Sequence, residues 1–252
     1  MVDSSTNQLT LVFPQLPDFP ITQSNAALII VDMQKLDAHP DYGIGAKARA
    51  AGVGEVFDYY WTAVENAVGN QQRLLEAARA AAMPVLYTRI ATKSRDARDV
   101  GRQHAYVNMA VPKDSVDAQI LDEIAPGPDD IIISKTSSSP FNSTGIDHTL
   151  RSLDVNTLLV CGVVTNGCVE GTVRDASDLG YNVIMVPDAC AAVSEQLHQA
   201  AITNLDNAFC RCRTTQDVVR VLENLCVEGR ADGLEEPTGR ARQEISEYHA
   251  VE

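Results

Sequence analysis

The sequence predicts an α/β fold in which helices cover both faces of a mostly parallel sheet of about six strands. Two observations lead to this prediction. Short runs such as 26–32 (AALIIVD) and 158–164 (LLVCGVV) are almost continuously apolar, as expected for strands buried on both faces. Longer segments with a helical pattern lie between these runs, and strands that alternate with helices favour parallel pairing.

The predicted elements follow one another in a regular order. Strands are expected at 26–32, 85–90, 130–134, 158–164, 182–189 and 210–213, and helices near 59–82, 117–124, 145–153, 167–179, 195–209 and 216–225. Met83-Pro84 ends the first long helix, and Gly180 follows the helix at 167–179. Segment 37–58 has four glycines and matches neither pattern. We therefore expect a long loop there, either a lid or substrate wall or an ordinary surface excursion.

Length and composition predict one domain with two flanking segments. The chain has 252 residues, and we expect the domain to span 25–228, with an N-terminal arm at 1–24 and a charged C-terminal tail at 229–252. The net charge of -14 disfavours nucleic acid and anionic membrane surfaces as partners. The N-terminus lacks the pattern of a signal peptide, and no apolar run approaches the roughly 20 residues that span a bilayer. We therefore expect a cytoplasmic protein.

The six cysteines are expected to be free and mostly buried thiols. None of them forms a CxxC or CxxH pair, so the spacing does not favour a zinc site. Cys210 and Cys212 have the spacing of one face of a strand, which favours a role in the core.

Three residues of different chemical type stand at the carboxyl ends of predicted strands, where open α/β sheets bind ligands. Asp32 closes the first strand, Lys135 follows DIIIS, and Cys168 opens the helix after LLVCGVV. Taken singly, Asp32 is either a helix cap or a base, and Lys135 is either a surface lysine or a fixed cation. Taken together, the three form a nucleophile, a base and an orienting group.

The position of Cys168 is the most informative of the three. Gly167 permits a tight turn before it, so the thiol is expected in the first turn of a helix. Unpaired N–H groups and the helix dipole at that place predict a lowered thiol pKa and an oxyanion hole.

The motifs ALIIVDMQ, IISKTSSSPFNST and CGVVTNGCVEGTVRDASDLGYNVIMVPDACAA resemble those of isochorismatase-like hydrolases in order and spacing, over roughly 25–215. The resemblance implies a Rossmann-like three-layer α/β/α sandwich with a six-stranded sheet. It implies a catalytic triad of Asp32, Lys135 and Cys168. It further implies a cis peptide at Val163-Val164 and an oxyanion hole built from the backbone N–H groups of Val164 and Cys168.

Substrate-binding candidates are Leu36, Asp37, Phe141 and Asn166. Many relatives carry an aromatic residue shortly after the first aspartate, where this chain has Leu36 and Asp37. Asp37 therefore either faces the pocket and accepts hydrogen bonds from a substrate NH2 group or is an exposed acid in a loop. His198 is interpreted as structural rather than catalytic.

Within this family the residues favour the amidohydrolase branch. True isochorismatases lack the cysteine, and nicotinamidases carry a metal site with a DxH motif that is absent here. The resemblance thus implies a homo-oligomer, dimer or tetramer, that needs no metal and no cofactor. It would cleave a linear C–N bond of a small amide or ureido compound, such as a biuret- or triuret-like urea, an N-carbamoyl amino acid or ureidoacrylate. A nicotinamidase-type enzyme and a non-enzymatic thiol sensor are the alternatives.

Overall fold

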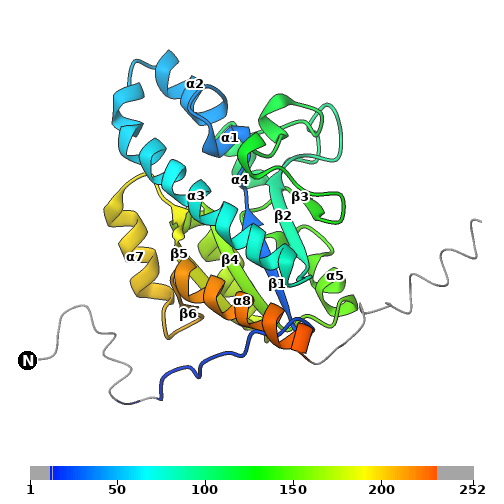
Figure 1. Cartoon of the computed structure of the whole chain (residues 1–252). Helices are drawn as coiled ribbons and strands as arrows, with labels where there is room; N and C mark the ends of the chain where they lie inside the picture. Colours follow the sequence, from blue (N-terminus) through cyan, green and yellow to red (C-terminus); the bar gives the residue numbers. More distant parts are fainter. Residues whose placement is uncertain (1–11, 13, 232–252) are drawn as a thin grey trace, which may run out of the picture.

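A computed structural model describes residues 12 and 14–231 of the chain and contains one parallel sheet (Figure 1). Its strands run in the order β3-β2-β1-β4-β5-β6. Their bounds are Ala26–Val31 for β1, Val85–Ile90 for β2, Ile131–Lys135 for β3, Thr157–Val163 for β4, Asn182–Ala191 for β5 and Arg211–Cys212 for β6. Every strand pair in this sheet is parallel, so the predicted α/β fold with six strands is confirmed.

Helices cover both faces of the sheet. Helix α3 (Asp58–Ala80) and helix α8 (Thr215–Ala231) pack side by side on one face (Figure 1). Helices α5 (Ile146–Ser152), α6 (Glu170–Asp178) and α7 (Glu195–Leu205) connect strands in the opposite direction across the sheet from α3. Because such connections are right-handed, these helices lie on the other face and form the third layer. No helix in the described part of the chain is long and apolar enough to cross a membrane.

The two central strands explain why the sequence runs are continuously apolar. Every residue of β1 and of β4 is buried, because helices pack on both sides of them. Since β1 pairs with β2 on one side and β4 on the other, the chain reverses its direction of travel across the sheet at this point. The carboxyl ends of β1 and β4 therefore flank the crevice where open α/β sheets bind ligands.

The expectation of a long loop at 37–58 is wrong. This segment holds part of α1 (Lys35–Ala38), all of α2 (Gly43–Ala50) and a 3-10 turn at Gly54–Phe57. A Cβ atom on Gly43 would lie 2.1 Å from the Leu36 carbonyl oxygen, and one on Gly45 would lie 2.0 Å from that of Pro40. These glycines allow the short helices to pack backbone against backbone. In the sequence alone, the same glycines are typical of a loop, which is why no helix was predicted here.

Smaller differences concern the ends of elements. The predicted helix at 117–124 is two 3-10 turns, Val116–Ala118 and Asp122–Ile124. A short helix α4 (Arg102–Tyr106) lies between the predicted strand at 85–90 and this segment, where no element was predicted. Helix α8 continues through Ala231, three residues past the predicted end of the domain at 228. Most of the predicted arm and tail, residues 1–11, 13 and 232–252, lie outside the described residues.

Candidate active site

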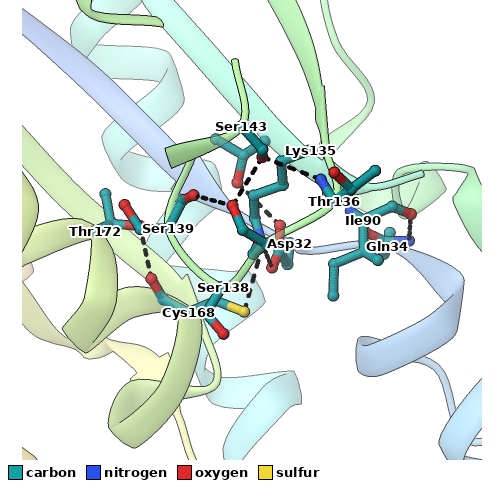
Figure 2. A network of polar contacts seen from close by, with 12 residues as sticks. Asp32, Gln34, Ile90, Lys135, Thr136, Ser138, Ser139, Ser143, Cys168 and Thr172 are labelled. Carbon is teal, nitrogen blue, oxygen red and sulfur yellow. Dashed lines mark hydrogen bonds and ion pairs between the residues drawn. The ribbon is translucent and has the colours of Figure 1, made fainter. Parts of the chain in front are cut away.

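Asp32, Lys135 and Cys168 meet at the carboxyl edge of the sheet (Figure 2). The Lys135 ammonium lies 2.7 Å from Oδ2 of Asp32 and 3.4 Å from Sγ of Cys168, so it bridges the other two side chains. The three residues come from the ends of β1 and β3 and from the turn after β4. The structure thus brings together the three residues that the sequence predicts to be nucleophile, base and cation.

Asp32 is aimed by a tight change of backbone direction at the end of β1. Its φ of +52° lies in the left-handed region, which aspartate tolerates better than most residues. Only 1% of Asp32 is exposed, and Oγ1 of Thr88 donates a 2.9 Å hydrogen bond to its Oδ1. The neighbouring strand approaches closely at Gly162, where a Cβ atom would lie 2.1 Å from the Val31 carbonyl oxygen. This packing fixes the carboxylate toward Lys135.

Lys135 is a buried cation held by several acceptors. Its side chain is fully buried, and its ammonium donates to the Ser137 carbonyl at 2.9 Å in addition to Asp32. Burial lowers the pKa of Lys135, but attraction to Asp32 and Cys168 outweighs burial and raises the pKa. Lys135 therefore stays charged, and the buried site keeps its ion pair.

Cys168 lies in a π-helical turn at Thr165–Val169, directly before α6 begins. The Val163-Val164 peptide before this turn is cis, as the resemblance implied. The turn is closed by hydrogen bonds from the N–H groups of Gly167 and Val169 to the Val164 carbonyl, at 2.9 and 3.3 Å. Oγ1 of Thr172 donates to the Cys168 carbonyl at 2.6 Å. Cys168, the predicted nucleophile, is thus held in a hydrogen-bonded turn.

The expected lowering of the thiol pKa is wrong for this resting arrangement. Burial and the negative charge of Asp32 raise the pKa of Cys168 well above its usual value, and the opposing effect of Lys135 is smaller. A helix terminus and a lysine both favour a lowered thiol pKa, but the burial of Cys168 is the larger effect and depends on the tertiary fold. Cys168 therefore rests as a neutral thiol beside a carboxylate that can accept its proton.

One wall beside Cys168 is apolar. Cys168 packs against a small cluster separate from the main core, formed by Leu36, Ile90, Ala91, Met109, Val111 and Ala118. These residues come from α1, the end of β2 and the loop before β3. The ion pair of Lys135 with Asp32 beside Cys168 is itself buried from water, which strengthens its electrostatic interaction. Leu36, a predicted substrate-binding residue, is part of this wall.

The other predicted substrate-binding residues lie in different surroundings. Asp37 is 5% exposed and feels the charges of Asp32 and Lys135, so it is not an exposed loop acid. Asn166 belongs to the turn at Thr165–Val169 that holds Cys168, and its Oδ1 is buried without a hydrogen-bond partner among the described residues. The ring of Phe141 packs against Tyr181 with 5.8 Å between ring centroids, and its role in substrate binding stays a prediction. The oxyanion hole at Val164 and Cys168 remains a prediction.

Three further polar residues, which were not predicted from the sequence, lie at the site. Gln34 ties the end of β1 to β2 through both the N–H and the carbonyl of Ile90, at 2.5 and 3.0 Å. Thr88 holds Asp32, as described above. His104 of α4 is 4% exposed, and burial together with the charge of Lys135 lowers its pKa. Gln34 lies inside the ALIIVDMQ motif and could have been noticed, whereas His104 comes from a polar loop with no distinguishing pattern.

His198 also contacts the turn at Thr165–Val169 that holds Cys168. Its Nδ1 lies 2.8 Å from Oγ1 of Thr165, which agrees with a structural role. Among residues 12 and 14–231, which the structure describes, no group of three or more His, Cys, Asp or Glu side chains is arranged to hold a metal ion.

Comparison with known proteins gives a consistent set of relatives. The family model described as Isochorismatase domain matches residues 26–217. The chain is similar to an N-carbamoylsarcosine amidase of an Arthrobacter species, 34% identical over 64% of this chain and 63% of the amidase. It is similar to the ureidoacrylate amidohydrolase of Methylobacterium radiotolerans, 32% identical over 79% and 80% of the two chains. A solved structure of a cysteine hydrolase from Pseudomonas syringae pv. phaseolicola matches with a TM-score of 0.72 and 32% identity, over 85% of this chain and 99% of that one.

Proposed function

The chain belongs to the isochorismatase family, and on that premise we propose that it is a cysteine-dependent amidohydrolase. Its substrate would be a small carbamoyl or ureido compound whose linear C–N bond is cleaved with release of ammonia. The names of the relatives, an amidase and an amidohydrolase, support this reaction class. The observation that carries the proposal is the Lys135 ammonium, 2.7 Å from Asp32 and 3.4 Å from Cys168 in a buried site.

In the first half of the reaction, Cys168 attacks the carbonyl carbon of the substrate while its proton moves to Asp32. A neutral thiol is a poor nucleophile, so transfer of the proton during attack suits a thiol whose pKa burial has raised. The backbone N–H groups of Val164 and Cys168 are proposed to stabilise the oxyanion that forms. Asp32 returns the proton to the departing nitrogen, ammonia leaves, and a thioester remains on Cys168.

In the second half, water attacks the thioester. Asp32 accepts a proton from the water and returns it to the sulfur, which restores the thiol and releases a carboxylic or carbamic acid. Lys135 stays charged throughout, because it holds Asp32 in place and compensates the negative charge that passes between oxygen and sulfur. This division of work needs one base that acts twice, which the single carboxylate at the ion pair provides.

Ammonia release from a panel of small compounds tests the proposal. Biuret, N-carbamoylsarcosine, ureidoacrylate and nicotinamide are incubated with the wild type and with Cys168→Ala. Cys226→Ala is the matched control, because Cys226 is a half-buried thiol on α8, distant in the chain from the triad. We expect the wild type and Cys226→Ala to release ammonia from at least one carbamoyl or ureido compound and Cys168→Ala to release none. Turnover of nicotinamide alone would instead favour a nicotinamidase-type enzyme.

A further inference from the structure

The carboxyl of Asp37 is a second buried acid beside the triad. The residue is 5% exposed, and Leu36 next to it packs in the same apolar wall as Cys168. The hydroxyl of Tyr60, a fully buried residue of α3, donates a 2.8 Å hydrogen bond to the Asp37 carbonyl and fixes the backbone there. Asp37 is therefore held in a defined place near the nucleophile and is not a mobile loop residue.

This carboxyl is unusual because part of it is left without a partner. Its Oδ2 is buried and makes no hydrogen bond to any of the described residues. Burial first, and then the charges of Asp32 and Asp117, raise the pKa of Asp37 to about 8, against the opposing charges of Lys135 and Lys47. Tyr60 and Cys168 are the other titratable groups that it influences. A buried polar atom without a protein partner is rare in a native protein and calls for a partner from outside the chain, such as a ligand or a water molecule.

The surroundings of the triad offer little to a negatively charged substrate. The cations of α1, α2, β2 and β3 are Lys35, Lys47, Arg49, Arg89 and Lys135. Lys35 bonds Gln119, Lys47 bonds the Asn108 carbonyl, and Arg49 bonds Asp41. Arg89 bonds Ser134 and the Ala118 carbonyl, and Lys135 bonds Asp32. A substrate carboxylate next to Asp37 would be desolvated without a free cation from these elements to compensate it.

We propose that Asp37 is a specificity-determining residue, whose carboxyl binds the amide beyond the scissile carbonyl and selects an uncharged ureide over one that ends in a carboxylate. A protonated carboxyl presents one donor and one acceptor side by side, which is the complement of an N–H and C=O pair. This inference rests on the proposed amidohydrolase function. It also separates this chain from relatives whose names contain the acids ureidoacrylate and N-carbamoylsarcosine.

Steady-state kinetics on matched substrates test the proposal. Biuret is the uncharged probe, and N-carbamoylsarcosine is the probe with a carboxylate. We expect the wild type to have the higher kcat/KM on biuret. Asp37→Leu keeps the size but loses both hydrogen bonds, so its kcat/KM on biuret should fall by about 10- to 150-fold, mainly through KM. Asp37→Asn keeps one donor and one acceptor and should stay within about fivefold of the wild type at pH 7.

The pH profile separates recognition from a merely structural role. In the wild type, kcat/KM on biuret should fall as the pH rises through about 8, because the ionised carboxyl loses its donor and gains a charge. Asp37→Asn cannot ionise and should lack this fall. Asp41→Asn, the same change on an exposed carboxyl four residues away, should keep the wild-type profile. Equal activity of Asp37→Leu and wild type, or an unchanged profile in Asp37→Asn, would overturn the proposal.

Calorimetric binding distinguishes failure of this inference from failure of the proposed function. Biuret is titrated into Cys168→Ala, with and without Asp37→Leu. If the wild type cleaves no ureide but the binding depends on Asp37, the amidohydrolase function is wrong and the role of Asp37 stands. If ureides are cleaved but neither binding nor kinetics depends on Asp37, only the specificity role is wrong. Absence of both cleavage and binding overturns both proposals.

Discussion

The two ends of the sheet differ in how completely their polar groups are satisfied. At the amino end, a cavity of about 630 Å³ is lined by Val85 and Ile131 at the starts of β2 and β3, and by the ion pair of Arg79 with Asp130. Asp130 accepts from Arg79 at 2.6 Å and from the Gly127 N–H at 2.7 Å. At the carboxyl end, buried atoms of Asp37, His104 and Asn166 lack partners among the described residues.

This difference shows that volume alone does not identify a functional site. Arg79 and Asp130 satisfy each other at the amino-end cavity, whereas the carboxyl end keeps buried polar atoms that no described residue satisfies. The ion pairs differ in the same sense. Arg79 is 41% exposed, but the side chains of Lys135 and Asp32 are 0% and 1% exposed. Breaking the first pair is expected to cost little and breaking the second a great deal.

The largest effect is expected for Cys168. Cys168→Ala should abolish turnover, because no other group in the site can form the thioester. Cys168→Ser should nearly abolish it, because a hydroxyl has a far higher pKa than a thiol and Asp32 is a weak base for it. Ammonia release measured at high enzyme concentration checks both variants, with circular dichroism to show that they are folded. Substantial turnover by folded Cys168→Ala would show that Cys168 is not the nucleophile.

Asp32→Asn comes next, with an expected loss of roughly a thousandfold or more in kcat, because it removes the proton acceptor without changing shape. Adding Cys168→Ala should make it no worse than Cys168→Ala alone, because members of one catalytic unit are not additive. Asp32→Asn should also lower the free energy of unfolding by about 3 to 5 kcal/mol, because it leaves the buried Lys135 ammonium without its partner.

Thr88→Val is the matched control for Asp32. It removes only the 2.9 Å hydrogen bond to Oδ1 of Asp32 and keeps the ion pair, so it should cost about tenfold in kcat. Kinetics of the two variants side by side check the ranking. A loss in Thr88→Val as large as that in Asp32→Asn would mean that orientation, rather than the base itself, limits the reaction.

A smaller effect, on stability, is expected at Asp37. Its pKa is about 8 in the folded protein against an ordinary value of 3.8, so the folded state binds this proton more tightly. This group therefore stabilises the folded protein most below pH 4, and that stabilisation is lost as the pH rises from about 4 to 8. Asp37→Asn should thus raise the free energy of unfolding relative to wild type at pH 8, by a few kcal/mol at most, and much less at pH 4. Urea unfolding at both pH values checks this. An equal difference at the two pH values would contradict it.

The smallest effect is expected at the amino end of the sheet. Arg79→Ala removes a partly exposed ion pair, so it should change the free energy of unfolding by about 1 kcal/mol or less and leave kcat and KM unchanged. Thermal unfolding and steady-state kinetics check the two halves of this expectation. A clear change in KM would show that the amino-end cavity takes part in binding, and it would remove the contrast between the two ends.

The sequence predicts those parts of the molecule that depend on local pattern. Apolar runs locate the strands, and because the carboxyl ends of parallel strands share one edge, the sequence alone predicts that Asp32, Lys135 and Cys168 meet there. The prediction of a loop at 37–58 was wrong because Gly43 and Gly45 allow close helix packing, whereas glycines in a sequence are usually taken to indicate a flexible loop. The prediction of a lowered pKa for Cys168 was wrong because the burial of this thiol depends on segments distant in the sequence.

The apolar wall and His104 could not be predicted for a related reason. Met109 and Val111 lie in a stretch that is otherwise rich in charge, and only the tertiary fold turns them toward Cys168. His104 likewise becomes a site residue through the path of the loop between β2 and β3 and not through its neighbours in the sequence. Side chains that reach a site from loops carry no periodic pattern, so contact with the site is their only signal.

Trapping the covalent intermediate tests the central claim most directly. Wild-type enzyme is mixed with the best ureide substrate from the panel, quenched in acid within the first turnovers and digested, and each cysteine-containing peptide is weighed by mass spectrometry. We expect an acyl adduct on the peptide that contains Cys168 and none on the other five cysteines. An adduct on another cysteine, or steady ammonia release with no adduct on any cysteine and full activity in Cys168→Ala, would contradict the account.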